Sequence, residues 1–143
     1  MVVSPTTRIY DVKITAKYSR PRRRYVRVLF ILSGRSANPI WLEISGSGVV
    51  CHDATELWGK ETYTTEDEVV AMSESEAGAM VIGPAGENRV SFACIKSDRW
   101  RSLGRGGMGA VLGSKLVKAI SFAGEEKAEI ADIDLVRSPA KRI

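Results

Sequence analysis

The sequence predicts an α+β fold made of short-stranded β-sheets and two modest helices. Three observations support this prediction. Short apolar or alternating runs lie between glycine and proline residues, which is typical of strands. Two segments have the composition of short helices, and the regular strand–helix alternation of a doubly wound sheet is missing.

The expected strands are runs rich in apolar and β-branched residues. In chain order they are Tyr25–Ser33, Ile40–Ser45, Val49–His52, Ala79–Ile82, Asn88–Ile95 and Val117–Phe122. The loosely alternating segment Ile9–Lys17 is also compatible with a short strand. Gly46-Ser47-Gly48 is expected to close a tight hairpin, because glycine accepts the positive φ that such turns need.

Two segments predict helices. Thr64 can cap a helix whose first turn is acidic, a charge that the positive end of the helix dipole favours. This helix is expected to continue to about Ser75 and to stop near Gly78. The second, shorter helix is expected over Gly109–Lys115. Residues 54–60 between these elements predict a loop with an apolar anchor.

Length and composition bound the class of protein. The chain has 143 residues, 44% hydrophobic and 27% charged, which suits one globular domain rather than a disordered chain or a coiled coil. No run approaches the roughly 18 apolar residues of a membrane span, and no signal peptide is evident, so a cytoplasmic location is expected.

The cysteine and histidine content excludes several kinds of metal site. Cys51 and Cys94 are too few for a disulfide framework, a four-cysteine zinc site or an iron–sulfur cluster. His52 is the single histidine, and without a third ligand nearby it is not expected to form a metal site with Cys51. Cys94 alternates with apolar neighbours and is expected to be a small buried hydrophobe.

Positive charge is concentrated near the N-terminus. The net charge is +4, but residues 1–60 contain ten Lys and Arg against four Asp and Glu. Most of the excess lies in Arg20, Arg22, Arg23, Arg24 and Arg27. Such a run can bind phosphate backbones, but only Tyr18 and Tyr25 lie near it as stacking partners. A solvated basic arm is therefore favoured over a nucleic-acid interface.

The most informative stretch is the glycine-rich segment Arg99–Lys115. Four glycines fall within the six residues 104–109, with Arg101 and Arg105 beside them. Glycine lets backbone amides approach an anion, the following helix start adds partial positive charge, and arginine adds forked donors. The sequence therefore favours an anion site, while a turn shaped only by packing remains the alternative.

Two familiar phosphate motifs do not fit this segment. Gly104, Gly106 and Gly109 satisfy the spacing of the dinucleotide fingerprint, but the polar stretch 96–103 separates them from any predicted strand. The helix that follows is also too short for a crossover. Gly113-Ser114-Lys115 reverses the residue order of a P-loop.

Four ordered motifs resemble those of the tungsten-containing aldehyde ferredoxin oxidoreductase family. They are GRSANPIWLEI from Gly34, ELWGKETYTTEDEV from Glu56, IGPAGENRVSFACI from Ile82 and GRGGMGAVLGSKLVKAISFAG from Gly104. The resemblance covers about Tyr25 to Phe122 and points to the second half of the N-terminal, pterin-binding domain. It implies an oxidoreductase that converts aldehydes to carboxylic acids with a tungsten or molybdenum bis-pterin and passes electrons to ferredoxin.

The resemblance also implies roles for particular residues. Arg101, Leu103 and Gly104 occupy positions that contact the pterins in the family, and Ser102 lies where a backbone carbonyl meets magnesium. A carbonyl oxygen suits this hard cation, so the Ser102 hydroxyl need not matter. Arg105 either holds a pterin phosphate or pairs with Asp98.

Other residues in these motifs have simpler explanations. Trp58 and Gly59 are expected to serve packing and a turn, and Glu87 and Asn88 are expected to serve turn chemistry. None of the four is expected to bind the cofactor.

Departures from the family pattern suggest an incomplete domain. Residues 1–24 form an unmatched basic arm, 25–124 a partial tungstopterin-binding domain, and 125–143 a polar tail. The family's earlier Gly-Gly-Arg-Gly segment and its cysteine ligands for a [4Fe–4S] cluster are not found. The chain alone is therefore expected to be inactive and to depend on the remaining oxidoreductase domains. The alternative is a non-catalytic module that binds phosphate ligands or nucleic acid.

Overall fold

A computed structural model describes residues 13–19, 27–45, 48–73 and 77–123. The described residues fall into two units: residues 14–19 and 27–32 belong to one, and Lys13 with residues 33–45, 48–73 and 77–123 belongs to the other. The first unit contains a two-stranded sheet of β1 (Lys13–Ser19) and β2 (Arg27–Ser33). These strands confirm the expected ones in part, because residues 9–12 and 25–26 lie outside the described residues.

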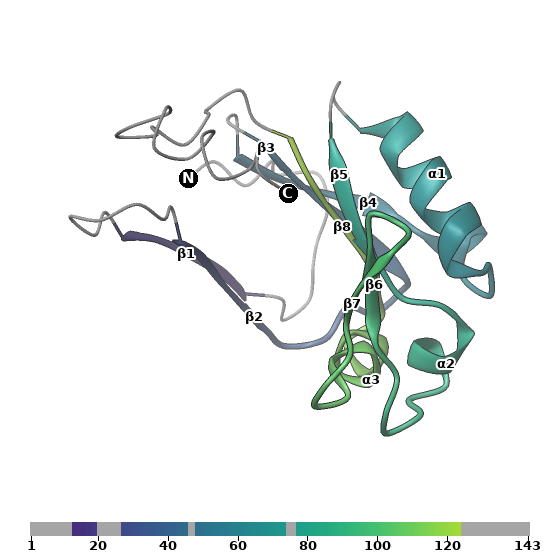
Figure 1. Ribbon diagram of the computed structural model, residues 1–143. Coiled ribbons are helices and arrows are strands. Elements are labelled where there is room, and N and C mark those ends of the chain that lie inside the picture. Colours follow the sequence, from purple (N-terminus) through teal and green to yellow (C-terminus); the bar gives the residue numbers. More distant parts are fainter. Residues whose placement is uncertain (1–12, 20–26, 46–47, 74–76, 124–143) are drawn as a thin grey trace, which may run out of the picture. The chain divides into compact units, whose positions relative to one another are not determined.

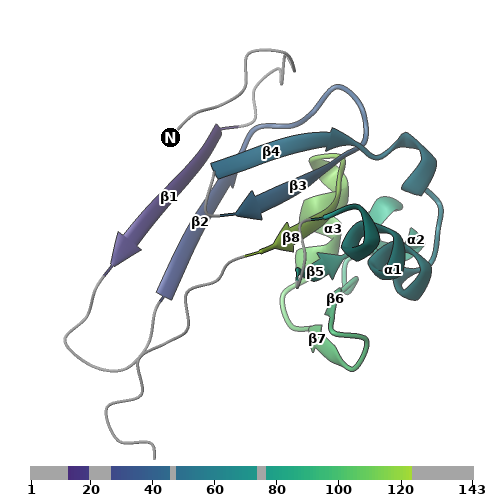
Figure 2. The ribbon, with the colours of Figure 1, turned by 90° about the horizontal axis from the view of Figure 1, so that it is seen from above.

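The second unit is built on a mixed six-stranded sheet. Its strands are β3 (Ile40–Ser45), β4 (Gly48–Asp53), β5 (Gly78–Val81), β6 (Ile95–Ser97), β7 (Arg101–Leu103) and β8 (Val117–Phe122). They are arranged in the order β4-β3-β8-β5-β6-β7, which can be followed in Figure 2. Only β3 and β8 pair in parallel, and the other neighbours are antiparallel. This architecture confirms the predicted α+β class.

The hairpin of β3 and β4 follows the sequence prediction closely. Its register runs from Ile40 opposite Asp53 to Ser45 opposite Gly48. Gly48 therefore begins β4 instead of belonging to the turn, and residues 46–47 lie outside the described part of the chain.

Three α-helices and one short 3-10 helix accompany this sheet within the described residues. Helix α1 (Thr62–Met72) lies against β5 and β8 (Figure 1). Helices α2 (Pro84–Glu87) and α3 (Met108–Ser114) pack on each other, and α3 also contacts β8. The 3-10 helix η1 spans Thr55–Leu57 and places Leu57 in the core as the apolar anchor expected of this loop.

The core lies between α1 and the centre of the sheet. Its members share almost complete burial of apolar side chains. They are Trp41, Ala54, Leu57, Val69, Ala79, Val81 and Ala119. Burial of these apolar side chains is the main source of favourable folding free energy. Strand β8 runs through this region, and Val117, Lys118 and Ala119 are all fully buried.

The predicted strand Asn88–Ile95 is wrong. Pro84 begins α2, because proline fits the first helical position, and the Asn88 side chain donates to the Pro84 carbonyl at 2.9 Å. Phe92 is 80% exposed while Ala93 is buried, the reverse of the expected alternation. The strand β6 begins only at Ile95.

The start of α1 also differs from the prediction. The helix begins at Thr62 with Glu61 as its N-cap, and Thr64 makes no capping bond. The Glu61 carbonyl accepts two hydrogen bonds from Thr65, one from its backbone N–H at 2.9 Å and one from its hydroxyl at 2.8 Å. The acidic residues 66–68 consequently lie beyond the first turn, which contains no acidic residue.

Candidate functional site

The five residues expected at the cofactor site form one continuous exposed segment. Arg101, Ser102 and Leu103 make up β7, and Gly104 and Arg105 follow it directly. The polar stretch before Gly104 was not expected to form a strand. Strand β7 is the last strand of the six-stranded sheet, so one side of its backbone faces away from the sheet.

The two arginines of this segment are available to an anion. Arg101 lies 3.9 Å from Asp98, but their side chains are 81% and 57% exposed, and such ion pairs are weak. Arg105 is exposed and makes no ion pair within the described part of the chain. Among the described residues, Asp98 pairs with Arg101, and no ion pair joins it to Arg105; whether Arg105 holds a phosphate stays a prediction.

The Ser102 hydroxyl already has a neighbour. It accepts a hydrogen bond from Lys96 Nζ at 3.0 Å, across the β6–β7 pair in which these two residues face each other. The Ser102 hydroxyl is therefore already hydrogen-bonded to a side chain of the same chain. The role of the Ser102 carbonyl toward magnesium stays a prediction.

The glycines of the segment divide into two groups, and the first group is explained by packing. A Cβ on Gly113 would lie 1.9 Å from the Gly86 carbonyl oxygen, where α2 and α3 cross. A Cβ on Gly109 would lie 2.5 Å from the Cys94 carbonyl oxygen, and Gly107 combines a φ of +65° with a similar clash. These positions need glycine for the fold alone.

Gly104 and Gly106 form the second group. A Cβ at either position would meet no atom within 4 Å, so packing within the described chain does not require glycine there. The φ of +92° at Gly106 does favour glycine, but Gly104 has no such need. Between two exposed arginines, a backbone without side chains suits close approach by an anionic group such as a phosphate.

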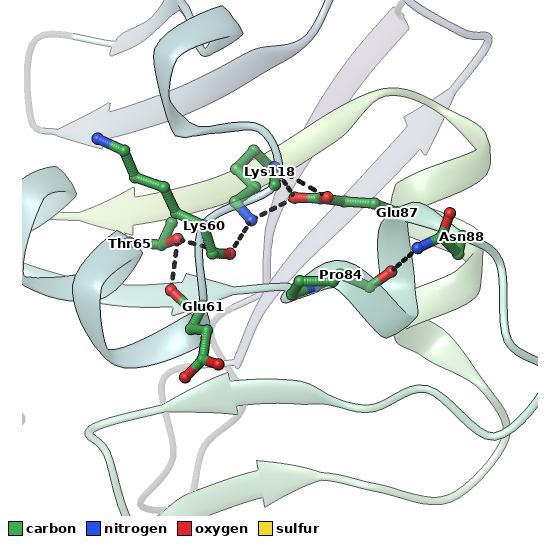
Figure 3. Close-up of polar contacts among 8 residues, drawn as sticks. Lys60, Glu61, Thr65, Pro84, Glu87, Asn88 and Lys118 are labelled. Atoms are coloured by element: carbon green, nitrogen blue, oxygen red, sulfur yellow. Dashed lines mark hydrogen bonds and ion pairs between the residues drawn. The ribbon is translucent and has the colours of Figure 1, made fainter.

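A buried ion pair joins β8 to α2 (Figure 3). Lys118 Nζ, from β8, donates to Glu87 Oε1, from α2, and the two side chains are 0% and 5% exposed. Lys118 Nζ also donates to the Lys60 carbonyl at 2.8 Å. The Glu87 carboxylate accepts the Gly59 N–H at 2.9 and 3.0 Å.

This network was not found from the sequence. Glu87 was expected to serve turn chemistry, whereas it joins three segments that lie 28 to 58 residues apart. Gly59, Glu87 and Lys118 belong to three of the four motifs that carried the family resemblance. Asn88 and Gly59 do support turns as expected, and Gly59 has a φ of +90°.

Burial changes the titration of two groups. The pKa of Lys118 is lowered from 10.5, because burial disfavours the ammonium ion more than Glu87 stabilises it. Burial raises the pKa of the Cys51 thiol to about 11.

His52 belongs to a structural cluster. Its Nε2 lies 2.9 Å from Glu43 Oε2, and its ring stacks on Trp41 with centroids 4.0 Å apart. Among the described residues no group of three or more His, Cys, Asp or Glu side chains could hold a metal ion. Cys94 is half-buried.

Arg20, Arg22, Arg23 and Arg24 of the basic arm lie outside the described residues. No helix in the described ranges is long and apolar enough to cross a membrane.

Comparison with known families defines the class of protein. Residues 1–124 match the family model described as aldehyde ferredoxin oxidoreductase, N-terminal domain. The match begins before Tyr25, where the resemblance noted in the sequence began. The chain belongs to this family, in agreement with its α+β fold.

Individual relatives are oxidoreductases by name. The chain is 40% identical to the tungsten-containing aldehyde ferredoxin oxidoreductase of Pyrococcus abyssi and 41% identical to that of Pyrococcus furiosus, in each case over 71% of this chain. It spans only 17% of the length of these relatives.

A solved structure is also similar. The BamBC active-site complex of benzoyl coenzyme A reductase, solved with 1,5-dienoyl-CoA, matches with a TM-score of 0.62 and 38% identity. The match covers 66% of this chain and 14% of that chain.

Proposed function

We propose that this chain is a cofactor-base segment of an aldehyde ferredoxin oxidoreductase, and that residues 101–105 bind the phosphate-bearing pterins of a tungsten or molybdenum cofactor. Family membership and the names of the relatives support the class of enzyme and the choice of cofactor. The parent reaction would oxidise an aldehyde to a carboxylic acid and pass the electrons to ferredoxin.

One observation carries the proposed site: no atom of the described residues gives Gly104 a packing reason to be glycine, and it lies between two exposed arginines. The packing of Gly107, Gly109 and Gly113 rules out a similar argument for them. A phosphate needs positive charge and close backbone approach, and the segment 101–105 offers both.

Each residue has a defined part in this proposal. Arg101 and Arg105 neutralise phosphate charge, Gly104 permits close approach, and Leu103 contacts the pterin ring system. The Ser102 carbonyl is a magnesium ligand, because a hard cation binds oxygen donors. The metal and its pterins supply the redox chemistry when bound, while this chain binds and orients them.

Turnover requires protein groups beyond this chain. Its two cysteines cannot supply the four thiolates of a [4Fe–4S] cluster, so we propose that the chain alone is inactive. Its partners would be the remaining oxidoreductase domains, ferredoxin and a small aldehyde, and its location would be the cytoplasm.

The experiment uses the tagged chain expressed in its native host. The complexes that it forms are purified, and tungsten, molybdenum and pterin are measured against protein. Arg101→Ala is compared with Arg35→Ala, which removes an exposed arginine outside the candidate site. We expect Arg101→Ala to lower cofactor content at least fivefold, since a charge-assisted contact contributes about 1.5–3 kcal/mol.

Equal metal and pterin content in the two variants would contradict the proposed site. Inorganic pyrophosphate binding to the purified chain, without metal or pterin in any complex, would instead support the alternative of a non-catalytic phosphate-binding module.

A further inference from the structure

Helix α1 holds the tip of the β6–β7 hairpin at one residue, Arg99. The Glu66 carboxylate accepts the backbone N–H of Arg99 with both oxygens, each at 3.2 Å. Asp67 pairs with the Arg99 guanidinium. The Tyr63 ring lies 5.7 Å from Arg99 Cζ, within the range of a cation–π contact.

These contacts differ in their surroundings. Glu66 is 7% exposed, and its bond goes to the backbone, so it fixes the path of the main chain. The Arg99 and Asp67 side chains are 45% and 60% exposed, and exposed ion pairs of this kind contribute little. Hydrogen bonds from a backbone N–H to an ionised carboxylate are stronger than neutral ones. The Glu66 contact is therefore the principal one.

The hairpin tip needs such a contact. Asp98 and Arg99 have φ values of +49° and +55°. This conformation is disfavoured for residues other than glycine, because their Cβ atoms crowd the backbone. Two such residues in succession persist only where the surroundings hold them. Glu66 is the buried group that does so at Arg99.

The site itself has few contacts of its own. Strand β7 is three residues long, β6 is its one partner among the described strands, and all of residues 101–106 are exposed. Arg101 follows Arg99 after a single residue, Trp100. Whatever fixes the backbone at Arg99 therefore also fixes the start of the segment that carries Arg101 to Arg105.

We propose that Glu66 is a positioning residue: by holding the Arg99 N–H, it keeps β7 and the following glycine turn in the conformation that receives a phosphate group. Its effect on binding rests on the proposed function, whereas its effect on the hairpin does not. The acidic run that resembled a helix start thus acts on a hairpin turn 33 residues further along the chain.

The test uses amide hydrogen exchange of the full chain, followed by NMR. Glu66→Ala removes the acceptor, and Glu66→Gln keeps one neutral oxygen in place. Asp67→Asn is the matched control, because it weakens the exposed pair to the same arginine. We expect exchange at Arg99 to accelerate at least tenfold in Glu66→Ala and less in Glu66→Gln. The amide shifts of Arg101–Arg105 should change with it, while the β8 amides and Asp67→Asn stay as in the wild type.

Binding is measured in parallel with inorganic pyrophosphate as the probe. Wild-type shifts over residues 101–105 should saturate, and Glu66→Ala should weaken the affinity at least fivefold. Exchange at Arg99 and shifts at 101–105 that are equal in the Glu66 variants and Asp67→Asn would overturn the positioning role. A different outcome is faster exchange at Arg99 in Glu66→Ala together with no pyrophosphate binding by the wild-type chain. That outcome would overturn the phosphate role and support the positioning role.

Discussion

Lys118 Nζ donates to the Glu87 carboxylate where both side chains are shielded from solvent. The pair joins the centre of the sheet to α2, and α2 in turn packs on α3, which is part of the glycine-rich segment. A buried charge is tolerated only when it is paired and hydrogen-bonded. Each partner has a second contact, through the Lys60 carbonyl and the Gly59 N–H.

Lys118→Met should lower the free energy of unfolding by about 3–5 kcal/mol, because it leaves the Glu87 charge buried without its partner. Urea denaturation measures this loss. Lys60→Met is the control, since the Lys60–Glu68 pair is partly exposed and should contribute at most about 1 kcal/mol.

Replacing both partners should recover part of the loss. Lys118→Met with Glu87→Leu removes both charges, which is often close to neutral when the volumes match. The Gly59 N–H would still lack its acceptor, so recovery should be incomplete. A double variant less stable than Lys118→Met would contradict this account of the pair.

The Cys51 thiol predicts a loss of stability in alkaline solution. Its pKa is raised from 9.0 to about 11 in the folded chain, so the unfolded chain releases its proton first. The contribution of the neutral thiol to the free energy of unfolding is complete below pH 9 and is lost as pH rises to about 11. It amounts to at most about 2–3 kcal/mol.

Unfolding free energies of the wild type and Cys51→Ala, measured from pH 8 to 11.5, test this. The wild type should lose more stability than Cys51→Ala over this range. The lowered pKa of Lys118 acts in the opposite direction but equally in both proteins. Parallel curves would show that the thiol does not contribute.

Two glycine substitutions should separate folding from binding. Gly113→Ala places a methyl group against the Gly86 backbone and should destabilise the chain by about 1–3 kcal/mol or more. Gly104→Ala meets no atom and should stay within about 0.5 kcal/mol of the wild type. Pyrophosphate titration should nevertheless show weaker binding for Gly104→Ala; unchanged affinity would argue against close backbone approach there.

Ser102→Ala should leave the effect of magnesium on pyrophosphate binding unchanged. The substitution removes the hydroxyl that Lys96 contacts but keeps the backbone carbonyl. Titrations with and without magnesium measure the difference. Loss of the magnesium effect in Ser102→Ala would assign the role to the hydroxyl instead.

Sequence patterns predicted elements well where local chemistry decides them. The hairpin of β3 and β4 and the strand β8 follow from apolar runs and glycine turns, and both lie close to their expected bounds. Patterns were misleading at Asn88–Ile95, where six alternating residues suggested a strand. There Pro84 and Asn88 favour a helical turn, and the backbone of residues 91–94 then lies close to Gly107 and Gly109 at the start of α3.

The candidate site was predictable as a stretch of sequence, since Arg101 to Arg105 are adjacent in the chain. Which glycines serve packing was not predictable, because Gly109 and Gly113 meet backbone atoms from residues 86–94. The contact between Glu66 and Arg99 was not predictable either, because the sequence equally allowed Glu66 to lie in the first turn of a helix and to interact with the helix dipole.

By itself, the sequence determined the family, the α+β class and the segment that carries the positive charge, because each depends on residue types and on spacing along the chain. Only the tertiary structure decided that Lys118 is buried against Glu87 and that Glu66 accepts a hydrogen bond from Arg99. It also decided which glycines are required by packing. The physical reason is that burial and hydrogen bonding depend on which distant segments meet. A lysine in a strand has the same local preferences whether the neighbouring helix brings it a carboxylate or leaves it in water.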